Sequence, residues 1–276
     1  MATSPALERA ALPAPGPQGA PVPATARVGR IPLFALVFSA GLALFISIDP
    51  VQPWILLVLT ALVAIGADGV IRSHPHGEFH TIADTAPYLF VPVLFTLSAG
   101  LFLEDVVLSY WAVPSVIGAG VLMGAALYAE HVSVDPEGGS FPAARFVLNV
   151  VTYLTAFGFY AVVYGFDVDL LPAAFAVGLV SMLLSIEIFR EAEADPARAL
   201  VFAAVIGVIV AEARWVLYFI PLDGFLAGVF ILLVFYLATG VISHYLTEHL
   251  DRNVLLEFAF VTAAGLAIVI GGRILG

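Results

Sequence analysis

Two charged residues lie inside a long apolar run in the C-terminal half of the chain. Glu212 and Arg214 fall within the segment 197–219, whose other residues are mostly apolar. A charge at the centre of a bilayer costs about 2.5–3.5 kcal/mol on insertion scales, so each side chain needs a partner or water. At two positions apart on a helix, their side chains point about 200° from each other and cannot pair well. We therefore expect separate partners on other helices, as in a polar pathway or a substrate-binding site. The competing interpretation has Arg214 extend to the interface beside Trp215, with Glu212 protonated or hydrogen-bonded.

A second group of chemically active residues occupies seven consecutive positions. Imidazole and carboxylate groups are the usual ligands of zinc and similar ions, so a weak metal site is one interpretation. The spacing matches no established ligand pattern, and the proline and glycine between the ligands favour a flexible, solvated loop instead. The four candidate ligands are His74, His76, Glu78 and His80.

Three further polar residues fall within apolar runs. Glu187 and Glu257 are the acids that we expect to be buried among helices, where clustered carboxylates bind a cation or relay protons. The competing interpretation places them in water at the interface. Asn149 is predicted to form a hydrogen bond between neighbouring helices, a structural role.

Composition identifies lipid as the solvent for most of the chain. Hydrophobic residues make up 62% and charged residues 11% of 276 positions, against roughly 45–50% and about 25% in soluble domains. The net charge of −11 argues against binding to nucleic acid, which requires basic surfaces. Cysteine and lysine are absent, which excludes thiolate metal sites, Fe–S clusters and Schiff-base cofactors. No common hydrolase or metalloprotease motif occurs, so an enzyme is disfavoured, and the identity of any cofactor stays open.

Nine apolar runs approach the roughly 20 residues that a membrane-spanning helix needs. Eight of the ten arginines fall on one side of the predicted bundle, which places the N-terminus in the cytoplasm and the C-terminus outside. The three tryptophans, Trp54, Trp111 and Trp215, fall near the predicted outer ends of their helices. The runs are 31–48, 51–71, 85–103, 107–129, 143–165, 170–189, 197–219, 224–247 and 254–274.

The predicted fold is therefore an all-α transmembrane bundle of about nine helices. Aspartates at 49, 105, 167 and 223 recur in the outer turns, which suggests four tandem two-helix hairpins plus one helix. The competing interpretation is that any row of helical hairpins places polar residues at a regular interval, without a true repeat. Residues 1–30, rich in Ala and Pro, are expected to be a disordered cytoplasmic tail, and 31–276 the membrane domain. A signal peptide is the competing interpretation of the first apolar run.

The sequence leaves three functions open for this multi-pass protein of the cell membrane. The favoured one is a non-catalytic membrane component: a scaffold, a sensor or a complex subunit, with the bilayer and further copies or other subunits as partners. The second is a transporter or channel for a small solute, ion or lipid, which would use the intramembrane Glu and Arg residues. The third is an enzyme that acts on a lipid-borne substrate at the cytoplasmic face.

Overall fold

A computed structural model describes residues 30–75, 77, 79–106, 111–166, 168–192, 195–220, 222–247 and 251–275. This part of the chain contains nine α-helices and no strand, and each helix is long and apolar enough to cross a membrane. The all-α fold predicted from the sequence is confirmed, and the protein is a multi-pass membrane protein. Of the predicted tail, residues 1–30, positions 1–29 lie outside the described residues, and Arg30 is the first residue of α2. The helices are α2 (Arg30–Ser47), α3 (Pro53–Arg72), α4 (Ile82–Val106), α5 (Ala112–Val132), α6 (Phe141–Gly165), α7 (Leu170–Ala192), α8 (Pro196–Leu217), α9 (Gly224–Leu246) and α10 (Arg252–Leu275).

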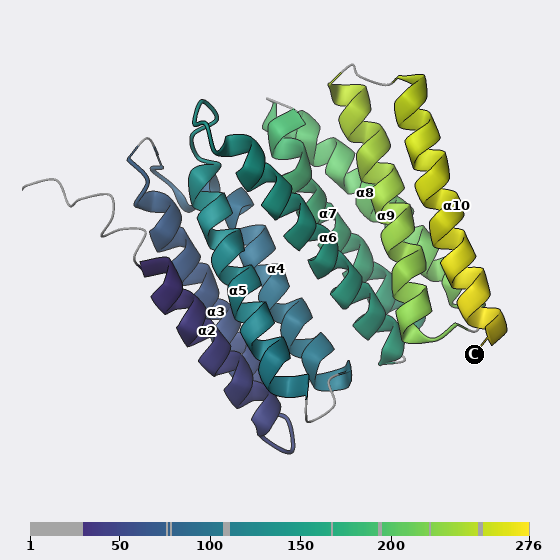
Figure 1. Cartoon of the computed structure of the whole chain (residues 1–276), viewed down its shortest axis with the longest axis horizontal. Helices are drawn as coiled ribbons and strands as arrows, with labels where there is room; N and C mark the ends of the chain where they lie inside the picture. The colour runs from purple at the N-terminus through teal and green to yellow at the C-terminus, as the bar shows by residue number, and fades with distance from the viewer. Residues whose placement is uncertain are drawn as a thin grey trace, which may run out of the picture.

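Successive helices run in opposite directions and lie side by side in one elongated bundle (Figure 1). We call the end of the bundle where α2 begins the Arg30 end, and the end where α2 finishes the Asp49 end. The helix bounds differ from the predicted ones by up to five residues. The largest shift is at α5, predicted from 107 and observed from Ala112. Helix α4 begins three residues early because the Asp84 carboxylate accepts hydrogen bonds from the backbone N–H groups of His80 and Thr81.

The packing of the helices repeats after every fourth helix. In the first four helices, α2 packs on α3 and α5, and α4 also packs on α3 and α5. The same neighbours recur in the next four, where α6 and α8 each pack on α7 and α9. Two hairpins thus make one unit, and α10 packs mainly on α9. The sequence carries the same period: Arg72 and Arg190 lie 118 positions apart, as do Asp105 and Asp223. The predicted hairpins are therefore grouped in pairs, with α6 and α7 packed against α4 at the junction of the two units.

Glycines bring the helices of the second unit into backbone contact. A Cβ atom on Gly207 of α8 would lie 2.7 Å from the carbonyl oxygen of Gly178 on α7, and one on Gly178 would lie 2.8 Å from the carbonyl oxygen of Gly207. A Cβ atom on Gly228 of α9 would lie 3.0 Å from the Cα atom of Ala161 on α6. Lipid offers helices no hydrophobic drive to associate, so close packing of this kind is a main source of their attraction.

Candidate functional site

Four charged side chains meet in the interior of the bundle near the Arg30 end. An Arg145 Nη atom lies 2.5 Å from Glu187 Oε1, and Arg190 contacts the other Glu187 oxygen at 2.8 Å. Arg190 also contacts Glu130 at 3.1 Å and donates a hydrogen bond to the Ser133 hydroxyl at 2.7 Å. The Glu130 and Glu187 side chains are fully buried. We call Glu130, Arg145, Glu187 and Arg190 the ion cluster; its formal charges sum to zero.

The ion cluster joins the two four-helix units. Glu130 comes from α5 of the first unit, whereas Arg145 and Glu187 come from α6 and α7 of the second. The Arg190 guanidinium also lies 3.9 Å from the ring centre of Tyr88 on α4, a cation–π contact that adds a fourth helix. Because removing one partner from a buried ion pair leaves an uncompensated charge, the cluster makes separation of these helices costly.

The sequence predicts that one member of this cluster, Glu187, is buried, but it does not predict the arginines that pair with it. Glu187 was expected among the helices, and the structure places it there. Arg145 and Arg190 are two of the eight arginines whose distribution predicts the membrane orientation, and that distribution does not predict that they pair with Glu187. The spacing of Glu187 and Arg190, three residues apart on one helix, was the available signal of their pairing.

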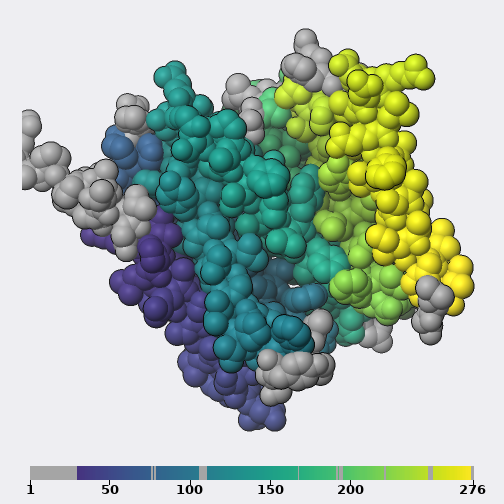
Figure 2. Space-filling view, in the orientation of Figure 1, coloured from purple at the N-terminus to yellow at the C-terminus, as the bar shows by residue number. Residues whose placement is uncertain are grey.

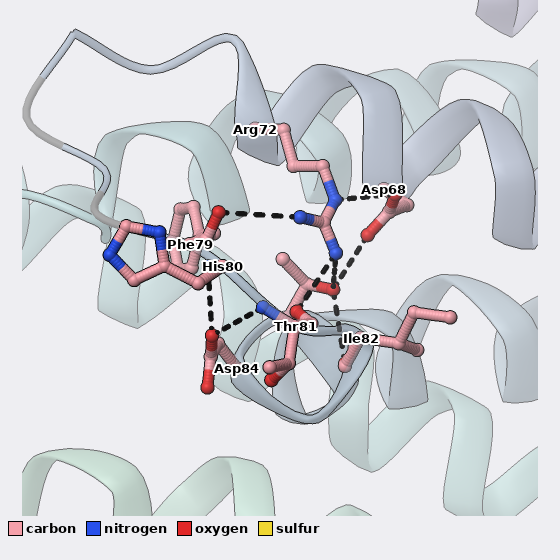
Figure 3. Close-up of polar contacts among 8 residues, drawn as sticks. Asp68, Arg72, Phe79, His80, Thr81, Ile82 and Asp84 are labelled. Atoms are coloured by element: carbon pink, nitrogen blue, oxygen red, sulfur yellow. Dashed lines mark hydrogen bonds and ion pairs between the residues drawn. The ribbon is translucent and has the colours of Figure 1, made fainter.

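A second polar group holds the connection between α3 and α4 (Figure 3). The Arg72 guanidinium contacts Asp68 at 2.8 Å and donates to the carbonyl oxygens of Thr81 at 2.9 Å and Phe79 at 3.4 Å. The Thr85 hydroxyl donates to the second oxygen of Asp68 at 2.6 Å. The Asp68–Arg72 pair is about 30% exposed, unlike the ion cluster. It therefore fastens a surface loop at the Arg30 end rather than an interior junction.

The predicted metal ligands fall in this loop. His76 and Glu78 lie outside the described residues, so their part in a metal site stays a prediction. His74 packs edge-on against His131 of α5, with ring centres 4.7 Å apart, and the His80 backbone N–H is bound to Asp84. Among the residues that the structure describes, no three His, Asp or Glu side chains come close enough together to hold a metal ion.

Arg214 and Glu212 lie on different sides of α8. The Arg214 side chain is buried and its guanidinium lies 4.8 Å from the ring centre of Tyr164 on α6. It lines a cavity of about 350 Å³ near the Asp49 end, together with Tyr164, Tyr218 and Gly224. Glu212 is exposed. The expectation that both residues face the bundle thus describes Arg214 only, because 200° of rotation separates the two side chains on α8.

The remaining two candidates lie at less enclosed positions. Glu257 is exposed, because α10 packs mainly on α9 and leaves most of its own surface uncovered. Asn253, one turn earlier on the same face of α10, is an exposed hydrogen-bond donor close to it. Asn149 is half-buried on α6, and no hydrogen bond joins it to another described residue.

An apolar cleft opens between the two units beyond the ion cluster. It has a volume of about 340 Å³ and is lined by side chains of α4, α5 and α6, among them Phe95, Phe102, Leu122 and Phe157. Figure 2 shows the surface hollowed among the teal helices. No member of the ion cluster lines this cleft. The buried charges and the cleft are therefore separate features of one junction.

One family profile matches the chain from residue 30 to residue 271, which is nearly the whole nine-helix bundle. The chain belongs to the family described as Protein of unknown function (DUF5656). The matched range begins at the first residue of α2 and ends within α10, so it covers α2 to α9 and most of α10. No protein of curated function and no solved structure matches the chain.

Proposed function

We propose that the protein is a non-catalytic component of a membrane assembly, as a scaffold, a sensor or a subunit of a larger complex. The observation that carries this proposal is Glu212, an exposed carboxylate on α8 whose other exposed neighbours from Val201 to Val216 are all apolar or aromatic. Hydrocarbon offers a carboxylate no hydrogen-bond donor, so an acid at this position favours a second protein surface over lipid.

The buried charges favour the same conclusion. A carrier needs buried charged groups along a path that a solute follows, and an enzyme needs them open to a substrate. The members of the ion cluster instead contact one another across helices of both units. This arrangement suits a rigid framework, so the transporter and the lipid enzyme remain the less favoured alternatives.

A sharp test compares two exposed acids near the Asp49 end of the bundle, Glu212 and Glu104. The full chain is extracted from its host membranes into polymer-bounded lipid discs, and its mass is measured by native mass spectrometry. We expect an assembly of defined stoichiometry that is heavier than one 29.1 kDa chain, weakened by Glu212→Gln. Glu104→Gln, at the end of α4 and also exposed, should leave it intact. A wild-type chain that is a single 29.1 kDa species in the discs refutes the proposal.

We also propose that the Arg30 end faces the cytoplasm of the cell and the Asp49 end the outside, because arginine concentrates at the Arg30 end. The chain has no cysteine, so single substitutions report accessibility without background. In intact cells, a membrane-impermeant maleimide should label Asp49→Cys, and should label Glu137→Cys only after permeabilisation. The opposite pattern would reverse the orientation.

A further inference from the structure

From Val201 to Val216, the exposed face of α8 is an apolar stripe with one charge in it, Glu212; the other exposed charge of α8 is Arg198, near the opposite end of the helix. The exposed side chains follow each other at intervals of three or four residues, so they form one surface along the helix. Within one turn of Glu212, the same face carries Val208, Ile209, Trp215 and Val216. Only the tryptophan has a hydrogen-bond donor, a single indole N–H. The other exposed residues of the stripe are Val201, Val205 and Phe219.

Glu212 lies inside the membrane-spanning part of α8, where its apolar neighbours cannot stabilise a carboxylate. It precedes Leu217, the last residue of α8, by five positions, which is about 7–8 Å along a helix. A carboxylate at that depth lies within the apolar part of the span, where its ionised form needs a cation or several donors. A surface that complements this face therefore has to bring a positive group to the Asp49 end of the bundle.

The chain itself carries one group of the right charge and exposure. Among the described residues of the Asp49 half, the arginines are Arg214 and Arg273, and Arg214 is buried on another side of α8. Arg273 is exposed near the end of α10. It lines a groove of about 420 Å³ together with Leu217 and Ile220, so it lies on the side of α10 that is turned toward α8. Glu212 and Arg273 are thus exposed side chains of opposite charge in the same half of the bundle, on two helices that both pack on α9.

We propose that two copies of the chain associate through α8 and α10, with Glu212 of each copy paired to Arg273 of the other. A two-fold axis parallel to the helices produces both ion pairs from one contact, since such an interface uses the same patch on each copy. Glu212 lies five residues and Arg273 two residues before the last residue of its helix. That is a difference of about 4–5 Å along the helix axes, which the long arginine side chain can accommodate. Only 11% of the α10 span is buried within one chain, so this helix has surface to contribute.

This inference rests on the proposed function and names its partner as a second copy. The test is charge exchange in lipid discs, with the dimer fraction measured by native mass spectrometry over a range of protein concentrations. Glu212→Arg and Arg273→Glu should each weaken dimerisation about tenfold or more, and the double variant should restore most of it. Glu212→Gln is a milder change, for use if the chain folds poorly with Arg at this position. It should weaken dimerisation by a smaller factor. The control Glu104→Arg reverses an exposed acid of the same end on α4 and should leave the dimer unchanged.

The outcomes separate the pairing from the proposed function. A double variant as weak as the single ones, or an Arg273→Glu variant that dimerises normally, overturns the pairing. In a second outcome, the chain does not bind itself but forms a complex with another membrane protein, and Glu212→Gln weakens that complex. This result overturns the second copy as partner but leaves the proposed function standing. A chain that is monomeric and forms no complex in its own lipids overturns both.

Discussion

Replacement of Glu187 tests directly whether the ion cluster holds the two units together. The two carboxylate oxygens of Glu187 contact Arg145 at 2.5 Å and Arg190 at 2.8 Å. Glu187→Gln keeps the size of the side chain and removes its charge. Glu130 is then the remaining carboxylate of the ion cluster, and both guanidinium groups lose a contact with opposite charge in the interior of the bundle.

The expected destabilisation follows from the burial of the pair. Removing one partner of a buried ion pair costs about 3–5 kcal/mol. With a shift of about 2–4 °C per kcal/mol for chains of this size, the Tm should fall by roughly 6–20 °C. Intrinsic tryptophan fluorescence measures this in detergent or in lipid discs, because the chain has three tryptophans and none is in the ion cluster.

A double variant separates charge balance from the loss of a contact. Arg145→Met with Glu187→Met removes one charge of each sign and leaves Glu130 paired with Arg190. We expect the double variant to lose less stability than the sum of the losses of Arg145→Met and Glu187→Met, by a coupling free energy of about 0.5–3 kcal/mol. The reasoning is wrong if the two single effects simply add, because charge balance would then play no part.

The matched control is Asp68, which pairs with Arg72 at the corresponding helix end of the first unit. That pair is about 30% exposed, and exposed ion pairs contribute about 0–1 kcal/mol. Asp68→Asn should therefore lower the Tm by no more than about 4 °C. If Glu187→Gln and Asp68→Asn lower the Tm equally, burial of the ion cluster does not determine its contribution to stability.

Two further predictions concern packing and the loop at the Arg30 end. Gly207→Ala should destabilise the chain by about 1–3 kcal/mol, because its Cβ would press on the backbone of α7. The control Gly69→Ala, at a position with open space around it, should be neutral or slightly stabilising. Thermal unfolding of both variants checks this, and equal Tm values would contradict it. Arg72→Met should release the carbonyl oxygens of Phe79 and Thr81, so amide hydrogen exchange in the α3–α4 connection should accelerate while that of the α7 core stays unchanged; uniform acceleration would contradict this.

The helices themselves could be predicted because their cause is local. A run of about 20 apolar residues is long enough to span a bilayer, and only a helix satisfies every backbone group inside it. The bounds were less certain, since they depend on single contacts such as that of Asp84 with the backbone before α4. The metal-ligand prediction was weaker still, because the spacing of His74 and His80 says nothing about where a loop directs their side chains.

The sequence by itself determined that the chain crosses the membrane, how many times its described part does so, and which charges lie within the spans. Tertiary structure alone decided which of these charges meet. Glu187 finds two arginines at the junction of the two units, Arg214 packs over Tyr164, and Glu212 remains on the surface. The physical reason is that the helices of a membrane bundle are apolar on nearly every face, so hydrophobic periodicity does not mark which face meets which neighbour. Close packing at a few glycines and pairing of buried charges determine which helices pack together. Both kinds of contact join residues that are far apart in the chain.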